Sequence, residues 1–270
     1  MSDPLIAMRD VARRFPGQGG RPRFTAVQDI TLDIAEGSFV AVVGPSGCGK
    51  STLLNMIAGL DAPSEGRITV AGDIVAGRLR HDVGYLFQKD ALLPWKTVQA
   101  NVEMPLVFRR MPGDHGGIAR EWLTRVGLAG FEKNFPHQLS GGMRKRVALA
   151  ATFVYGPRIL LMDEPFSALD VQTRNMMENE LLDLWQQNNK TVVFVTHDLE
   201  EAIALADHVV VLTANPGRVK KQFRVTLDRP RNVNDIRFDD RFRDLHAEIW
   251  EALREEVARS YALQRQLVHG

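Results

Sequence analysis

The fold of this chain is decided by one short stretch, Gly44-Pro45-Ser46-Gly47-Cys48-Gly49-Lys50-Ser51-Thr52. It matches G-x-x-x-x-G-K-[ST], a phosphate-binding loop whose glycines let backbone N–H groups surround phosphate oxygens. Residues 39–43 before it are apolar and largely β-branched, which predicts a buried strand. Residues 53–58 after it carry apolar side chains at helical spacing, and Gly59 predicts the helix end. This order of strand, loop and helix is what the chemistry requires, so a chance glycine-rich turn is disfavoured.

The last residues of the loop extend this chemistry to side chains. In such loops the lysine, here Lys50, reaches the β- and γ-phosphates of a nucleotide. The hydroxyl that follows, here that of Ser51, is placed to bind Mg²⁺.

Composition narrows the class of protein. The 270 residues are 44% hydrophobic and 25% charged, which is ordinary for a globular protein. The formal net charge of +1 gives no global field that would favour nucleic acid. A single cysteine excludes an internal disulfide framework and fits a reducing compartment. We expect neither a secretory signal nor a membrane span, because no apolar run approaches about 20 residues.

Three more apolar runs end in polar residues: 83–87 before Gln88, 159–162 before Asp163 and Glu164, and 191–195 before His197. Side chains beyond the carboxyl ends of parallel strands line the ligand site of an α/β sheet. Near a phosphate-binding loop, Asp163 predicts a Mg²⁺ ligand and Glu164 predicts a general base that polarises water. The position of His197 after a strand indicates a contact with the γ-phosphate, although a lone histidine is more often structural. Gln88 is either a metal or water contact or an ordinary surface glutamine.

A helical block interrupts the strands from about residue 90 to residue 156. It contains predicted helices near 97–109, 118–126 and 141–155. The third begins after Leu139-Ser140-Gly141-Gly142-Met143. Ser140 suits an N-cap, and the two glycines leave the helix N-terminus open to an anion. The alternative is an ordinary capped helix without a ligand.

Further elements are predicted outside these motifs. Strands are expected at 5–8, 27–34, 66–70 and 209–212, with one more over 223–227. Phe15 is either a base-stacking platform or, more often for a lone aromatic, a core residue. An amphipathic helix carries Phe242, Leu245, Ile249, Leu253 and Val257 on one face. Packing on its own domain is favoured over binding a partner.

Taken together, the motifs resemble the ATPase subunit of an ATP-binding cassette (ABC) transporter over nearly the whole chain. Their order is that of the family: Phe15, Gly44–Thr52, Gln88, Leu139–Met143, Ile159–Glu164, Ser167–Asp170 and His197. The resemblance implies an α/β fold of the P-loop NTPase (RecA-like) type, with a mixed-sheet core, a β subdomain and an inserted helical subdomain. It implies a nucleotide-binding domain over 1–227, with the helical subdomain at about 90–156, and a C-terminal helical extension over 228–270.

The resemblance also implies roles within one chain. Phe15 would stack on the adenine of ATP, and Lys50 with the backbone of Gly44–Thr52 would hold the phosphates. Mg²⁺ would be ordered by Ser51, Gln88 and Asp163. Glu164 would be the general base and His197 the γ-phosphate sensor, which makes the implied catalytic set Glu164, His197, Lys50 and Gln88.

Other implied roles involve a second copy of the chain, whether identical or a paralogue. Ser140, Gly141 and Gly142 would face the γ-phosphate bound by that second copy. Asp170 would link the two sites across the dimer. Met143 stands where glutamine is usual, and this variant is similar to importers of nitrate, sulfonates and taurine.

The stretches Ala91–Trp95 and Asn215–Arg218 also resemble that importer group. The implied partners are transmembrane permease subunits, contacted around Gln88 to Leu106, and indirectly a periplasmic or lipoprotein substrate-binding protein. The chain would be peripheral, on the cytoplasmic face of the inner or plasma membrane, with no nucleic acid partner. Nitrate, taurine, alkanesulfonates, bicarbonate and aromatic or pyrimidine precursors are all compatible substrates.

The sequence disfavours two alternatives to a transport ATPase. A soluble, non-transport ABC ATPase acting on DNA, ribosomes or Fe–S assembly is disfavoured, because the chain has no long coiled coil, zinc site or second cassette. Its balanced charge also argues against nucleic acid. A regulatory cassette without hydrolysis would require the loss of Lys50, Glu164 or His197, and all three are present.

Overall fold

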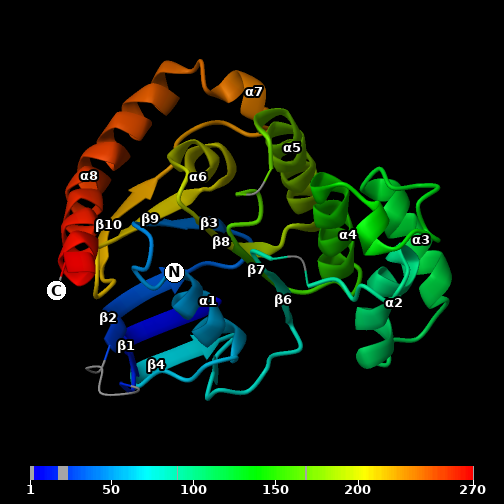
Figure 1. Ribbon diagram of the computed structural model, residues 1–270, viewed down its shortest axis with the longest axis horizontal. Coiled ribbons are helices and arrows are strands. Elements are labelled where there is room, and N and C mark those ends of the chain that lie inside the picture. Colours follow the sequence, from blue (N-terminus) through cyan, green and yellow to red (C-terminus); the bar gives the residue numbers. More distant parts are fainter. Residues whose placement is uncertain (1–2, 18–23, 90, 168, 270) are drawn as a thin grey trace.

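The computed structural model describes residues 3–17, 24–89, 91–167 and 169–269. The described residues form two sheets, with one helix packed between them (Figure 1). The smaller sheet is antiparallel in the order β2-β1-β4-β5. Its strands are β1 (Ile6–Phe15), β2 (Phe24–Ile34), β4 (Glu65–Val70) and β5 (Asp73–Ile74). The larger sheet has the order β10-β9-β3-β8-β7-β6.

The larger sheet is parallel except at one edge. Its parallel strands are β3 (Phe39–Val43), β6 (Val83–Leu86), β7 (Ile159–Asp163), β8 (Thr191–Thr196) and β9 (His208–Leu212). The edge strand β10 (Val219–Arg224) runs antiparallel to β9. Because both faces of a parallel sheet are covered, its strands are apolar at nearly every position.

Helices cover both faces of this sheet. Helix α1 (Lys50–Ala58) lies between the two sheets, and α5 (Val171–Asn188) and α6 (Leu199–Leu205) lie on the opposite face (Figure 1). To one side stand α2 (Val98–Phe108), α3 (His115–Arg125), the 3₁₀ turn η1 (Pro136–Gln138) and α4 (Gly141–Phe153). The chain closes with α7 (Val233–Ile236) and the long α8 (Asp240–His269). Within the described ranges, no helix has both the length and the apolar character to span a bilayer.

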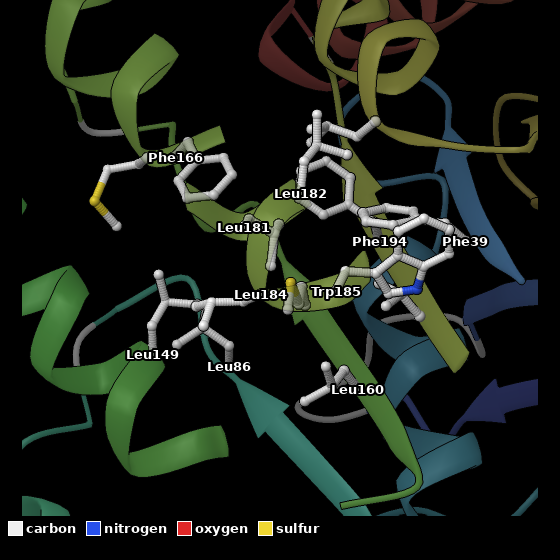
Figure 2. Packing of buried hydrophobic residues seen from close by; sticks show 14 of the residues in the cluster. Phe39, Leu86, Leu149, Leu160, Phe166, Leu181, Leu182, Leu184, Trp185 and Phe194 are labelled. Carbon is white, nitrogen blue, oxygen red and sulfur yellow. The ribbon is translucent and has the colours of Figure 1, made fainter. Parts of the chain in front are cut away.

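Strand alternation divides the core into two clusters. On β3, Val40 and Val42 face α1 and the smaller sheet, whereas Phe39 faces α5. There the Phe39 ring meets Trp185 edge-on at 5.7 Å and Phe194 at 5.9 Å, measured between ring centroids (Figure 2). Burying such rings contributes about 1.5–3 kcal/mol each. This packing holds the larger sheet rigidly between its helices.

Most strand predictions are confirmed, but the strand expected over 223–227 is wrong. Strand β10 instead covers Val219–Arg224, because its pairing with β9 runs from Val219 opposite Leu212 to Arg224 opposite His208. Val225 and Leu227 are buried in the core without belonging to a strand. Their apolar character thus reflects packing beyond the sheet edge.

The amphipathic helix expected near the C-terminus is confirmed, and its apolar face packs on the chain's own domain. Phe242, Ile249 and Leu253 of α8 are buried and join the core cluster that contains α6. In Figure 1, α8 runs along the side of the molecule that carries β9 and β10. The carboxylate of Glu256 also accepts a hydrogen bond of 2.9 Å from the backbone N–H of Ala214.

Candidate active site

The strand order brings the predicted polar residues to one edge of the larger sheet. Strands β3, β8, β7 and β6 are consecutive neighbours and parallel, so their carboxyl ends meet. The phosphate-binding loop follows β3, His197 follows β8, Asp163 and Glu164 end β7, and Gln88 follows β6. Residues spread over more than 150 sequence positions therefore surround one place.

The loop before α1 depends on glycine geometry. Gly47 and Gly49 have φ angles of +80° and +95°, in the left-handed region that side chains disfavour. A Cβ on Gly49 would also lie 2.5 Å from Cγ1 of Val27, so this position excludes any side chain. The loop ends where α1 begins, which leaves the first N–H groups of the helix free to face an anion.

Lys50 extends back over this loop. Its side chain is only 6% exposed, and its ammonium donates to the carbonyl oxygens of Gly44 at 2.8 Å and Pro45 at 3.2 Å. The positive charge is thereby kept within the loop. The neighbouring Cys48 thiol is buried, and burial raises its pKa, so it packs as a neutral group.

Oxygen ligands suitable for a divalent cation lie beside the loop. The Ser51 hydroxyl donates to Oδ1 of Asp163 at 3.0 Å. Burial raises the pKa of the Asp163 carboxyl, and the Glu164 charge adds to this, while the Ser51 hydrogen bond and Lys50 act against it. A hydroxyl and a half-buried carboxylate next to a second acid are donors that Mg²⁺ prefers. The residues present therefore fit such a cation.

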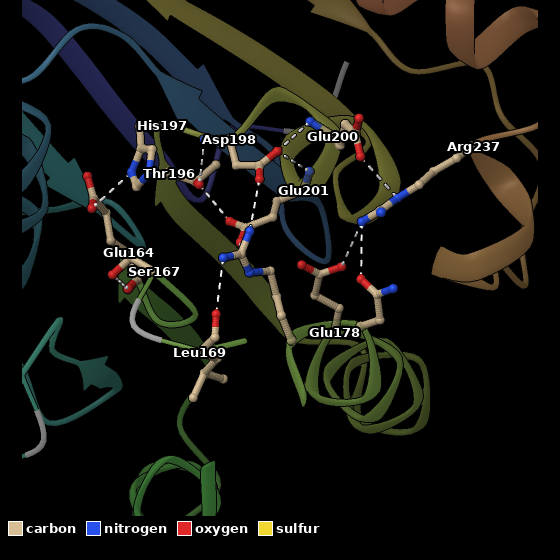
Figure 3. Close-up of polar contacts among 12 residues, drawn as sticks. Glu164, Ser167, Leu169, Glu178, Thr196, His197, Asp198, Glu200, Glu201 and Arg237 are labelled. Carbon is tan, nitrogen blue, oxygen red and sulfur yellow. Dashed lines mark hydrogen bonds and ion pairs between the residues drawn. The ribbon is translucent and has the colours of Figure 1, made fainter. Parts of the chain in front are cut away.

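Glu164 follows β7 and contacts residues that follow the neighbouring strands β6 and β8. Its Oε2 accepts from the amide of Gln88 at 3.2 Å. The same oxygen lies 3.1 Å from Nδ1 of His197 (Figure 3). The backbone of Glu164 is left-handed, with φ of +43°, a conformation that is strained for a side-chain-bearing residue. Its N–H donates to Val195 at 2.9 Å and its carbonyl accepts from the Ser167 hydroxyl at 3.0 Å. These bonds aim the carboxylate into the site.

The predicted N-cap before α4 is present. Ser140 Oγ accepts from the N–H of Met143 at 3.2 Å. Gly142 lets α4 approach α5, because a Cβ there would lie 2.7 Å from Cγ2 of Thr173. A cavity of about 810 Å³ opens beside Gly44–Ser46 and His197, and its other described lining residues come from α6, the turn before it and α8. Within one chain, then, the residues before α4 do not line that space.

Phe15 and Asp170 have simple local contacts. Phe15 ends β1 and is half-buried, with the Arg13 guanidinium 4.7 Å from its ring centroid. It is therefore neither a fully buried core residue nor a freely exposed ring. Asp170 is the N-cap of α5, and the hydrogen bond from Thr173 N–H, at 3.0 Å, lowers the pKa of its carboxyl. Ala168, in the same predicted segment, lies outside the described residues.

The chain is similar to known proteins over most of its length. The family model described as ABC transporter matches residues 27–167, more than half of the chain. An uncharacterized ABC transporter ATP-binding protein of Methanocaldococcus jannaschii, MJ0412, is 45% identical over 256 residues, covering 94% of this chain and 93% of the relative. The chain belongs to the ABC transporter ATP-binding protein family. Proteins of this family are ATPases, and this chain is an ABC ATPase.

Two named relatives of this ABC ATPase are import proteins. The aliphatic sulfonates import ATP-binding protein SsuB of Bacillus cereus is 39% identical, covering 87% of this chain and 92% of the relative. The taurine import ATP-binding protein TauB of Yersinia pestis is 48% identical, covering 74% of this chain and 77% of the relative. Among solved structures, the ATP-binding cassette MJ0796, dimeric and bound to ADP and Pi, superposes with a TM-score of 0.73. It is 32% identical and covers 83% of this chain and 100% of its own.

The structure adds a residue of the ABC ATPase that sequence reasoning missed. Lys145 of α4 is 5% exposed, and its ammonium donates to the carbonyls of Gln88 at 2.7 Å and Phe87 at 3.2 Å. It ties the helix after Ser140 to the segment that carries Gln88. In sequence it stands between Arg144 and Arg146, a run that is typical of a solvated helix face.

Proposed function

We propose that this ABC ATPase is the ATP-hydrolysing subunit of an importer for a small compound of the nitrate, sulfonate and taurine group. It would act as a homodimer on separate permease subunits, at the cytoplasmic face of the inner or plasma membrane, with a periplasmic or lipoprotein binding protein supplying the substrate. The observation that carries the proposal is the contact of Glu164 with Gln88 and His197 beside Lys50. The import relatives SsuB and TauB support the transport role.

In the proposed reaction, Lys50 and the N–H groups of Gly44–Thr52 bind the phosphates of ATP. Mg²⁺ would be held by Ser51 and Asp163, with Gln88 nearby, and it would supply positive charge against the phosphate oxygens. Glu164 takes a proton from the water that attacks the γ-phosphorus, and the bond to the bridging oxygen of ADP breaks. Phe15 is proposed to stack on adenine.

The second copy would complete the site. We infer that Ser140, Gly141 and Gly142 of one copy face the γ-phosphate bound by the other, with Asp170 near the contact. Supporting this arrangement, Ser140 and Gly141 are exposed at the N-terminus of α4, and a helix N-terminus attracts anions. The solved cassette MJ0796 is itself dimeric.

A groove supports permease docking near Gln88–Leu106. A cavity of about 550 Å³ lies between the segment after β6 and helices α2 and α4. Its apolar lining includes Phe87, Leu92 and Phe108, and Phe108 is 75% exposed. An exposed apolar groove of this kind suits a short amphipathic helix from a permease.

Two variants test the ATPase assignment. Lys50→Ala should reduce ATP turnover to background, because the loop loses its only side-chain cation for the phosphates. Glu164→Gln should bind ATP without hydrolysing it and accumulate as a dimer, measured by light scattering with ATP and Mg²⁺. Near-normal turnover by Lys50→Ala, or a Glu164→Gln protein that stays monomeric with ATP, would contradict the proposal.

The importer role needs a separate experiment. The ABC ATPase is co-expressed with a candidate permease from the same genome, and its recovery in the membrane fraction is measured. Phe108→Asp should abolish this recovery while leaving ATP turnover of the isolated protein unchanged, because a carboxylate would lie in the apolar groove. Equal recovery of the wild type with and without permease would instead favour a soluble, non-transport ATPase.

A further inference from the structure

A cluster of charged side chains lies behind the active site, between α5, α6 and α7 (Figure 3). At its centre is Glu178 of α5, which is 0% exposed. Neither carboxylate oxygen of Glu178 has a hydrogen-bond partner among the described residues. Burial and the nearby Glu201 charge raise the pKa of Glu178, Arg237 acts against them, and the resulting pKa is about 8. A buried carboxyl of this kind either keeps its proton or, when ionised, needs a nearby cation.

The nearby cation is Arg237, which directly follows α7 in the C-terminal extension. Arg237 Nη2 lies 4.0 Å from Oε2 of Glu178 and donates to the side-chain oxygen of Asn175 at 3.2 Å. Arg237 Nε lies 3.3 Å from Oε2 of Glu200 at the start of α6. One guanidinium therefore contacts α5 and α6 together, as Figure 3 shows for Glu178 and Glu200. Arg237 is outside residues 27–167, which the family model matches.

The same cluster reaches the active-site segments through Arg174. Its guanidinium donates to the carbonyl of Leu169 at 3.2 Å and to the carboxylate of Asp198, also at 3.2 Å. It also lies 3.7 Å from Glu201. Asp198 follows His197 and caps α6 by accepting from the N–H groups of residues 200 and 201. Through Asp198 and Arg174, His197 is thus linked to the carbonyl of Leu169, just before Asp170.

We propose that Arg237 is a positioning residue for hydrolysis: by holding Glu178 and Glu200 from the C-terminal extension, it fixes the start of α6, and with it His197, against α5. This rests on the proposed function, in which His197 contacts the γ-phosphate. Without Arg237, the buried Glu178 loses the cation that favours its ionised form, and α6 loses the contact between Glu200 and Arg237. His197 then reaches the γ-phosphate less often in the productive geometry, while the nucleotide-binding loop is untouched.

The test is steady-state ATPase kinetics on the full-length protein. Arg237→Met should lower kcat about tenfold and leave the KM for ATP within about twofold, because misplacement of a reacting group by about 1 Å can cost up to about 100-fold. Arg237→Lys, which keeps the charge, should recover most of the loss. Arg243→Met is the matched control, since Arg243 is an exposed arginine of the same extension that pairs only with Asp240 among the described residues. It should match the wild type.

A double variant separates positioning from loss of folding. Glu178→Gln removes a buried carboxyl that must either hold a proton at neutral pH or ionise without a cation, so the Glu178→Gln/Arg237→Met protein should be more stable than Arg237→Met in thermal unfolding. It should still have a lowered kcat, because Glu200 is still unanchored. Recovery of kcat in step with stability, or an Arg237→Met protein with wild-type kcat, would overturn the inference.

The two proposals fail in different ways. Turnover by Lys50→Ala at the wild-type rate would remove the proposed active site, whatever Arg237→Met does. If Lys50→Ala is inactive while Arg237→Met behaves like Arg243→Met, the active site stands and the positioning role of Arg237 is wrong.

Discussion

Replacing Glu178 by glutamine is expected to remove much of the pH dependence of the chain's stability. The side chain is fully buried, and its pKa of about 8 lies well above the ordinary value of 4.5. Glutamine has nearly the same shape and carries no charge at any pH. The substitution therefore isolates the free energy of ionising this one buried group.

Whether the free energy of unfolding rises or falls with pH depends on which state, folded or unfolded, holds the proton of Glu178. Below about pH 4.5, Glu178 is protonated in both the folded and the unfolded chain. Between there and about pH 8 the folded chain keeps a proton that the unfolded chain releases, so the free energy of unfolding falls as the pH rises. One pH unit is worth about 1.4 kcal/mol, so the loss between pH 5 and pH 8 is about 4 kcal/mol.

The assay is urea unfolding of the wild type and Glu178→Gln at several pH values from 5 to 8. The two proteins should be similar at pH 5, and the variant should be more stable by about 4 kcal/mol at pH 8. A remaining slope is expected in both, because burial raises the pKa of Glu201 to about 7. Glu248→Gln is the control, since Glu248 is exposed and pairs with Lys221. Parallel curves for wild type and Glu178→Gln would refute the reasoning.

Three further changes test the site more locally. Gly49→Ala should abolish ATP binding, measured by isothermal calorimetry, whereas Gly47→Ala should weaken it less, because both glycines have positive φ but only Gly49 lacks room for a Cβ. Met143→Gln should keep ATPase activity within about tenfold of the wild type, because the backbone N–H of residue 143 still donates to the Ser140 hydroxyl. Complete loss of activity would reveal a specific role for methionine. Ser167→Ala should lower kcat about fivefold, because a hydrogen bond worth about 1 kcal/mol no longer holds the strained backbone of Glu164.

The centre of the site was predictable because local and global signals agree there. The apolar run before Gly44–Thr52 can only be a buried strand, and the glycines that follow have one common use. Polar residues directly after apolar runs, such as Gln88 and His197, mark strand ends whatever the sheet order. The resemblance to ABC ATPases supplied the order of the motifs, and the structure brings those strand ends together.

The edge of the sheet and the charged cluster were not predictable in this way. Strand β10 begins at Val219 because β9 offers it an antiparallel partner, and its own sequence, Val-Lys-Lys-Gln-Phe-Arg, has little strand character. Lys145, Arg174 and Glu178 lie on helices where charged residues usually face solvent. Only the tertiary packing of the helices shows that Lys145 and Glu178 are buried and that Arg174 is half-buried against Asp198.

Contacts within one chain suggest why this ATPase would need a second copy for hydrolysis. The carboxylate of Glu164 is held by Gln88 and His197, and the ammonium of Lys50 is held by loop carbonyls, so each charged group already has partners. ATP must replace those partners, and the new contacts have to compensate for the old ones. At Lys50, the phosphates of ATP can replace the loop carbonyls without any group from a second chain. Freeing Glu164 requires His197 to turn toward the γ-phosphate, and on the proposed function that geometry is complete only when Ser140 of the second copy closes over it.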